Sequence, residues 1–309
     1  EMFQVGEMCW KAICTAGHTP ACMSFLVDEK IVFTGDLGNS PSPILPDTEK
    51  VTDADYMIME SVYGDRNHED RSERKQKLIK VINDNYKRGG TLMIPLFSLE
   101  RTQELIFEIN EMVAEKSIPE MPIFLDSPLA IKLTRIYKAN SKYFNQDARD
   151  IIASGDDIFN FPGLKLTEET SESKAILSVP NPKIIMAGSG MSNGGRIIHH
   201  EKNYLPNAND TLLLVGYQSV GTLGRLIQEG VKKITIQNEE IPVRAHIEMI
   251  SGYSGHKDSD HLVEFVADTA KTVKKVFTVM GEPKAALFLA QKIKDNLGIN
   301  TESPMVGDT

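Results

Sequence analysis

The middle of this 309-residue chain alternates apolar runs with helical patterns, and this alternation constrains the fold more than any other feature. Each run has the length of one buried strand, and apolar residues at helical spacing follow it. We expect strands at 91–96, 122–125, 183–187 and 211–215, each leading into a helix. Consecutive strand–helix units form a mostly parallel sheet that helices cover. The sequence therefore predicts an α/β fold.

Shorter segments flank this region. The pattern predicts a helix over 283–296 that ends at Gly298, and a helix that Ser127 caps and Pro128 begins. The stretch 166–174 is rich in Thr, Ser and Glu and is expected to be an exposed connection. Further strands are expected at 9–15, 23–27, 31–34, 56–60, 247–250 and 276–279.

Four polar residues share one kind of setting, a loop at the end of an expected strand. They are His18, Asp36, Glu60 and His256, and glycines flank several of them. Ligands of α/β sheets bind beyond such strand ends, and imidazole with carboxylate suits a hard-to-borderline divalent cation, which takes nitrogen and oxygen ligands. Any one of the four alone would be read as a turn residue or an exposed polar group. Four together favour a metal or catalytic site.

The remaining histidines are interpreted differently. His68 lies in a charged, polar stretch that reads as a solvated loop. His246 reads as a strand-end residue and His261 as a helix-surface residue. His199 and His200 fall on one helix, where we favour an ordinary structural role.

The glycine-rich loop 188–195 leads from an expected strand into a helix, so its backbone amides could hold a phosphate. It matches neither a Walker loop nor a dinucleotide fingerprint, and the signal is weak by itself. Arg196 is either a phosphate partner or a helix-surface residue. The candidate phosphate-binding residues are Ser189, Gly190, Met191, Ser192 and Arg196.

Composition narrows the class of protein. A net charge of −9 argues against a protein that coats nucleic acid through a basic surface, although it leaves room for a nuclease. No apolar run approaches the roughly 18 residues of a membrane helix, and no membrane partner is expected. Cys9, Cys14 and Cys22 form no CxxC pair, which favours reduced thiols and a cytoplasmic protein.

Several short motifs also occur in a fixed order over nearly the whole chain. They are Ala16-Gly17-His18, Gly35-Asp36-Leu37-Gly38, Glu60-Ser61-Val62-Tyr63-Gly64-Asp65, Ile94-Pro95-Leu96-Phe97, Asp126-Ser127-Pro128, Gly188-Ser189-Gly190-Met191, Gly216-Tyr217-Gln218, Gly221-Thr222-Leu223-Gly224-Arg225 and Ser251-Gly252-Tyr253-Ser254-Gly255-His256. In them the chain closely resembles the β-CASP branch of the metallo-β-lactamase superfamily. That branch includes bacterial and archaeal RNA nucleases and the nuclease subunit of the cleavage and polyadenylation specificity factor.

The resemblance implies a fold in two parts. Residues 1–66 and 246–309 would form the C-terminal portion of a metallo-β-lactamase αββα sandwich, and 67–245 an inserted β-CASP domain with a parallel sheet. The loops that carry the candidate residues would converge on one cleft between the two domains. We expect the chain to be N-terminally incomplete, to need the preceding part of the same protein for a complete site, and to be inactive alone. A homodimer is a further expectation.

The resemblance also implies roles for residues in a site that holds two zinc ions. His18 looks like a ligand of one zinc and Asp36 like the carboxylate that bridges both. Glu60 is similar to the acid that orients a histidine, and His256 to that histidine, the general acid for the leaving oxygen. Glu60 matches the form of the motif associated with members that act on RNA.

Two departures from the family pattern stand out. The motif His-x-His-x-Asp-His occurs nowhere in the sequence. Met280 stands where the family usually has a histidine that binds the second zinc, and a thioether is a poor zinc ligand. We therefore expect the second ion to bind weakly.

The function that we predict is metal-dependent hydrolysis of single-stranded RNA. The alternative is a non-catalytic RNA-binding or scaffold paralogue with a degenerate metal site, which Met280 supports. The presence of His18, Asp36, Glu60 and His256 opposes it. We favour the enzyme, because a site without catalysis has no chemical need for both a bridging acid and an acid–histidine pair.

Overall fold

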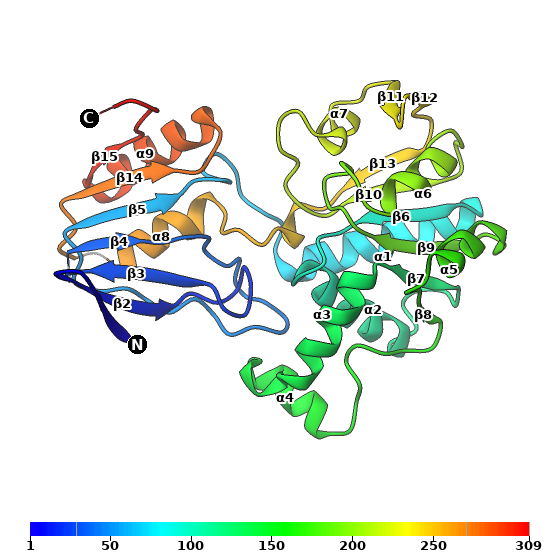
Figure 1. The fold of residues 1–309 in the computed structure, drawn as a ribbon, viewed down its shortest axis with the longest axis horizontal. Helices are drawn as coiled ribbons and strands as arrows, with labels where there is room; N and C mark the ends of the chain where they lie inside the picture. The colour runs from blue at the N-terminus through cyan, green and yellow to red at the C-terminus, as the bar shows by residue number, and fades with distance from the viewer. Residues whose placement is uncertain (29, 270, 309) are drawn as a thin grey trace. The chain divides into compact units, whose positions relative to one another are not determined.

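The computed structural model describes residues 1–28, 30–269 and 271–308, which form two compact units (Figure 1). Unit 1 comprises Glu1–His68 and Gly255–Thr309, and unit 2 comprises Glu69–Ser254. The chain passes from unit 1 to unit 2 two residues later than expected, and it returns to unit 1 nine residues later than expected. The reason for the second difference is the strand β13 (His246–Met249), which pairs with a strand of unit 2. Within the described ranges, no helix is long and apolar enough to cross a membrane.

Unit 1 is built on a seven-stranded sheet with the order β1-β2-β3-β4-β5-β14-β15. The first four strands pair antiparallel, and β4, β5, β14 and β15 run parallel. The bounds are β1 (Met2–Val5), β2 (Met8–Cys14), β3 (Met23–Val27), β4 (Ile31–Phe33), β5 (Tyr56–Glu60), β14 (Lys275–Val279) and β15 (Asn300–Glu302).

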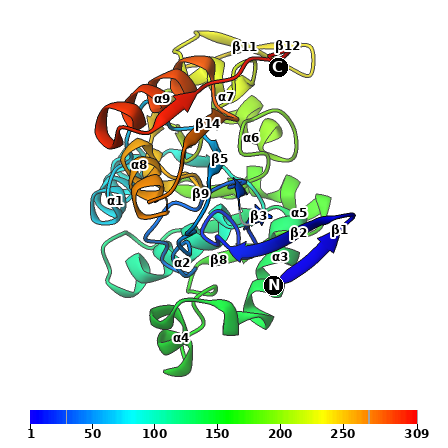
Figure 2. The ribbon, with the colours of Figure 1, turned by 90° about the vertical axis from the view of Figure 1, so that its left-hand side faces the viewer.

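The two helices α8 (Ser259–Thr269) and α9 (Pro283–Leu297) pack on one face of this sheet (Figure 2). Alternation along β5 decides which side chains meet them: Met57 and Met59 are buried in that core, while Ile58 faces the other way. The opposite face is also apolar, yet its side chains are exposed or only partly buried. It carries the aromatic group Phe3, Trp10, Phe25 and Phe33, whose ring centroids lie 6.0–6.4 Å apart.

Unit 2 contains a six-stranded sheet in which every pair of neighbouring strands is parallel, in the order β13-β10-β6-β9-β7-β8. This confirms the predicted α/β fold with a parallel sheet. The strands are β6 (Thr91–Pro95), β7 (Ile123–Asp126), β8 (Leu164–Leu166), β9 (Lys183–Ala187), β10 (Thr211–Leu214) and β13, beside the hairpin β11 (Lys233–Ile236) and β12 (Glu239–Pro242). The helices are α1 (Arg71–Arg88), α2 (Arg101–Ala114), α3 (Pro128–Ala139), α4 (Gln146–Ala153), α5 (Thr170–Ala175), α6 (Ile197–Tyr204) and α7 (Leu223–Gln228), with short 3-10 turns η1 (Ser141–Tyr143), η2 (Ile176–Ser178) and η3 (Ser251–Tyr253).

Local signals in the sequence account for several helix ends. The Ser127 hydroxyl accepts the Ala130 amide at the start of α3, and Gly298 ends α9 with a left-handed φ of 68°. The expectation that 166–174 is a plain connection is wrong, because this stretch contains the end of β8 and most of α5. A reciprocal capping box between Glu169 and Glu172 stabilises the start of that short helix.

Candidate metal centre

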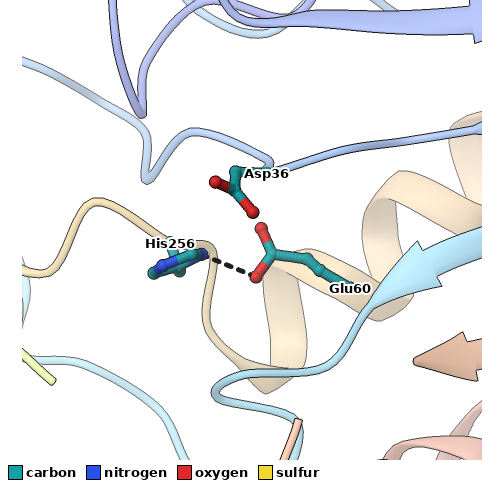
Figure 3. Close-up of side chains that lie close together, drawn as sticks. All are labelled: Asp36, Glu60 and His256. Atoms are coloured by element: carbon teal, nitrogen blue, oxygen red, sulfur yellow. Dashed lines mark hydrogen bonds and ion pairs between the residues drawn. The ribbon is translucent and has the colours of Figure 1, made fainter. Parts of the chain in front are cut away.

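Asp36, Glu60 and His256 come together in unit 1, with one ligand atom of each within 4.8 Å of the others (Figure 3). Asp36 follows β4, Glu60 is the last residue of β5, and His256 lies in the loop between η3 and α8. Figure 3 shows the two carboxylates facing each other and the imidazole beside Glu60. The structure thus unites three of the four residues that the sequence singled out at strand ends.

Glu60 holds the imidazole in place. Its side chain is fully buried, its Oε1 accepts the Leu37 amide at 2.5 Å, and its Oε2 lies 2.8 Å from Nδ1 of His256. When Glu60 is ionised, Nδ1 carries the hydrogen and donates it to the carboxylate, so Nε2 is the nitrogen that can exchange a proton with a substrate. The His256 side chain is 18% exposed, which gives solvent access to the ring.

The electrostatics of the two carboxylates favour a cation. Burial raises the pKa of Glu60, the hydrogen bonds from His256 and Leu37 oppose this rise, and the charge of Asp36 adds to it. Two carboxylates whose oxygen atoms lie within 4.8 Å of each other are stabilised by a positive charge placed beside them. Asp36 is 35% exposed and therefore able to bind an ion that arrives from solvent.

His18 completes the group. It follows β2, its Nε2 lies 3.7 Å from Oδ2 of Asp36, and its ring centroid lies 4.4 Å from that of His256. This Nε2–Oδ2 distance is too long for a hydrogen bond. Zinc binds nitrogen and oxygen at about 2.0–2.2 Å, which places two tetrahedral ligands roughly 3.4 Å apart. The donor set and its spacing therefore fit a zinc ion held by His18 and Asp36.

Glycines allow the loops of this group to approach one another. A Cβ atom on Gly38 would lie 2.2 Å from Cα of Gly17, and one on Gly255 would lie 2.6 Å from Nδ1 of His18. Real Cβ atoms do not come so close to other atoms, so these contacts require the bare backbone. The glycines beside His18, Asp36 and His256 are explained by this packing.

The backbone around His256 is held on both sides. Asn39 donates its amide to the Gly255 carbonyl at 2.8 Å, and Lys257 donates to the Leu37 carbonyl at 3.0 Å. On the other side, Nε2 of His68 lies 3.0 Å from the His256 carbonyl oxygen. The interpretation of His68 as a solvated loop residue is wrong, since it is partly buried and contacts the candidate site.

Met280 lies at the sheet edge where the family pattern places a histidine. It follows β14 directly, and Val279 pairs with Glu60 across the sheet. Its φ of 62° is left-handed and its side chain is 62% exposed. The Met280 side chain therefore contributes little to packing. A side chain that can bind a metal, such as histidine, would fit at this position without a clash.

The glycine-rich loop of unit 2 leads from β9 into α6. The Ser192 hydroxyl donates to buried Glu201 at 2.5 Å, and Gly190 packs so closely on Phe97 that a Cβ atom would lie 2.7 Å from the ring. Ser189 and Gly190 line a pocket of about 480 Å³. Met191, the next residue, accepts the Gly224 amide through its carbonyl at 3.1 Å. Convergence of this loop with the cluster of unit 1 stays a prediction.

Arg196 points to a carboxylate of the protein itself. Its guanidinium donates to Asp126 at 2.8 Å and to the carbonyls of Thr167 and Glu168 at 2.9 and 2.7 Å. Asp126 is fully buried and also bonds His200 at 2.7 Å, and these partners hold the pKa of Asp126 near 2 against the opposing effect of burial. The guanidinium thus has a structural partner, and its phosphate role stays a prediction.

Comparison with known families agrees with this geometry. Residues 102–227 match the model of the Beta-Casp domain, and residues 240–304 match that of the Zn-dependent metallo-hydrolase RNA specificity domain. A crystal structure of a protein of unknown function from Enterococcus faecalis V583 has a similar fold, with a TM-score of 0.51 at 11% identity, over 100% of this chain and 65% of that one.

Similar sequences are found among characterised proteins. Ribonuclease TTHA0252 of Thermus thermophilus is 34% identical over 280 residues, which cover 89% of this chain and 63% of the relative. Transcription termination factor FttA is 33% identical in Pyrococcus horikoshii and 31% identical in Methanosarcina mazei, over 90% and 88% of this chain. The matched segment amounts to 44% of each FttA chain.

Proposed function

The chain belongs to the β-CASP family of the metallo-β-lactamase superfamily, and from this membership we propose that it acts as a zinc-dependent ribonuclease on single-stranded RNA. The observation that carries the proposal is the cluster of Asp36, Glu60 and His256 with His18 beside it. A cation site next to an imidazole held by a carboxylate offers charge stabilisation and a proton donor, which phosphodiester hydrolysis requires. The names of the relatives, a ribonuclease and a transcription termination factor, support RNA as the substrate.

Each side chain has its own task in this proposal. His18 and Asp36 hold zinc, which when bound offsets the negative charge that develops on the phosphoryl group. His256 donates the proton to the departing oxygen through Nε2. Glu60 fixes the ring through Nδ1 and stabilises its protonated form, which is the form that a general acid needs.

We propose two zinc ions, of which the second binds weakly because Met280 supplies no good ligand. Structural and catalytic zinc sites use three or four protein ligands, so this centre requires more ligands than His18 and Asp36. We propose that they come with a second sheet of the lactamase-like sandwich. The apolar, partly exposed sheet face with Phe3 and Trp10 supports this part of the proposal.

RNA would contact unit 2 through the loop that leads into α6. Ser189 and Gly190 line its pocket, and backbone amides before a helix favour a phosphate. An acidic protein needs such local groups, because its overall charge of −9 repels the RNA backbone. We also propose a cytoplasmic location, which the three free cysteines support.

A non-catalytic RNA-binding or scaffold protein is the second candidate. Met280, in place of an imidazole at the edge beside Glu60, is the observation that favours it. The close Glu60–His256 contact favours the enzyme, because a scaffold has no need of an oriented proton donor.

A zinc titration followed by cleavage of a labelled single-stranded RNA, both carried out on the protein that includes the second sheet, tests the proposal. We expect Asp36→Ala to lose zinc and cleavage together, and His256→Ala to lose cleavage while it retains zinc. Asp295→Ala removes an acid of α9 outside the cluster and should change neither. RNA binding without cleavage by the zinc-loaded wild-type protein that includes the second sheet would establish the scaffold instead.

A further inference from the structure

Two consecutive residues, His68 and Glu69, bind the segment that carries His256 at both of its ends. Glu69 Oε2 accepts the Ser251 hydroxyl at 2.5 Å and the Gly252 amide at 2.7 Å. Lys77 donates to the other carboxylate oxygen at 2.9 Å. The start of the segment, η3, is thereby fixed to Glu69.

His68 binds the other end of the same segment. Its backbone amide donates to Oδ2 of Asp258 at 3.0 Å, and its Nε2 contacts the His256 carbonyl at 3.0 Å. The His68 ring packs on Tyr63 with 4.3 Å between centroids, which limits its rotation. Asp258 also binds the amide and Nδ1 of His261, at 3.0 and 2.7 Å, so this end is fixed from two directions.

The charge state of Glu69 suits its role as an acceptor. Burial raises the pKa of Glu69, but the hydrogen bonds from Ser251, Lys77 and the Gly252 amide outweigh this effect and lower the pKa to about 2. The carboxylate is therefore ionised at any pH at which the protein would work. An ionised acceptor forms the stronger class of hydrogen bond.

Buried groups of unit 2 reinforce the start of the segment. Arg74 donates to the Gly252 carbonyl at 2.7 Å, and Glu108 accepts the Tyr253 hydroxyl at 2.5 Å. The added Cβ of a residue at position 252 would lie 2.8 Å from the Glu69 carbonyl oxygen. Residues 251–253 are thus packed directly on the backbone of Glu69 within unit 2.

The position of the His256 ring matters because proton donation requires hydrogen-bond reach to the leaving oxygen. A displacement of about 1 Å at a reacting group can reduce the rate on the order of 10²-fold. Glu60 fixes only the ring, through Nδ1. The backbone from which the ring projects is fixed by other groups, among them His68.

We propose that His68 positions His256 by fixing the backbone from which its ring projects. His68 is a positioning residue and not a catalytic one, since it acts through that backbone. The boundary between the units falls at 68/69 and at 254/255, so His68 and His256 both belong to unit 1, whereas Glu69 holds Ser251 and Gly252 within unit 2. The inference rests on the proposed function of His256 as proton donor.

The first test observes His256 without any reaction. In protein labelled with ¹⁵N-histidine, the Nδ1 proton bonded to Glu60 gives a low-field NMR signal, assigned by its loss in His256→Ala. We expect His68→Ala to broaden or abolish this signal. His68→Gln retains an amide donor for the His256 carbonyl and should restore it. His199→Gln, a change at an exposed histidine of α6, is the matched control and should leave the signal intact.

The second test separates positioning from stability. With zinc-loaded protein that includes the second sheet and with labelled RNA, His68→Ala should lower kcat about 10- to 100-fold at unchanged KM and zinc content, with most of the rate recovered in His68→Gln. His68→Leu, which also lacks the donor, covers the case in which His68→Ala fails to fold. An unchanged NMR signal in these folded variants would overturn the inference. A lost signal with no cleavage by the wild type would uphold the positioning and refute the ribonuclease.

Discussion

Glu60 is the residue on which the orientation of His256 depends. In Glu60→Gln the side chain keeps its shape, but its amide no longer stabilises a protonated imidazole and favours the other tautomer. We expect cleavage to fall by about 10²- to 10⁴-fold, the range that general acid catalysis supplies. Zinc content should stay at the wild-type level. Single-turnover cleavage and elemental analysis measure both quantities, and parallel loss of zinc would make Glu60 a ligand.

A substitution at Met280 should change the affinity for the second zinc ion. An imidazole at this position would lie at the sheet edge beside Glu60, and the exposed side chain can be replaced without loss of packing. We expect Met280→His to bind the second zinc at least about tenfold more tightly, or about 1.4 kcal/mol. Saturating zinc should remove the difference in activity by mass action.

The matched control at this position is Met280→Leu, which keeps the left-handed backbone and adds no ligand. It should leave zinc affinity unchanged. Equal zinc titrations of all three proteins would refute the account of Met280 as a missing ligand.

Single residues also show what could be predicted from the sequence. Asp36 and Glu60 were identifiable because Asp36 follows an apolar strand and Glu60 ends another, and strand ends in such sheets meet at one edge. His68 was not, because its partner His256 is 188 residues away and the local sequence is polar and charged. Asp126 likewise gave no signal of the buried network that it forms with Arg196 and His200.

At the level of elements, the loops that carry His18 and Asp36 touch each other through their glycines. This contact should contribute to the free energy of unfolding. A Cβ atom at position 38 would meet backbone atoms of Gly17, which cannot move aside as a side chain could. We expect Gly38→Ala to destabilise the protein by about 1–3 kcal/mol, the cost of overpacking, and to weaken zinc binding. Urea unfolding and a zinc titration measure the two effects.

Gly194→Ala is the control for this change, because a Cβ atom there meets nothing within 4 Å. Its stability should stay close to that of the wild type. If Gly38→Ala were equally stable and bound zinc normally, the close approach of the two loops would not be required for the site.

The bounds of the strands were predicted better than the pairing of the strands into sheets. The bounds of β3, β5 and β9 agree with the expected 23–27, 56–60 and 183–187, because continuous apolar runs identify buried strands. The run at 247–250 was also recognised as a strand, but its sheet was not, since pairing of β13 with β10 is a long-range choice. The helix α5 escaped prediction because six residues contain too few turns to show a period.

On the scale of the whole molecule, one face of the sheet of unit 1 is apolar but not buried. Helices α8 and α9 cover the other face. Phe3 and Phe33 are exposed, and Trp10 and Phe25 are only partly buried. Contiguous apolar patches of this kind mark a surface that another layer or another chain covers. A second sheet in a lactamase-like sandwich would do so.

This face can be tested through Trp10, which is the sole tryptophan of the chain. We expect the chain alone to associate with itself as concentration rises, with a blue shift of Trp10 emission as the face becomes covered. Phe33→Glu places a charge beside Trp10 and should suppress both effects with unchanged far-UV circular dichroism, since Phe33 is exposed. Met305→Glu, at an exposed apolar residue in the segment after β15, should suppress neither. Sedimentation velocity combined with fluorescence separates the outcomes. A wild-type chain that stays monomeric with unshifted emission would show that water tolerates this face and that no second layer is needed to cover it.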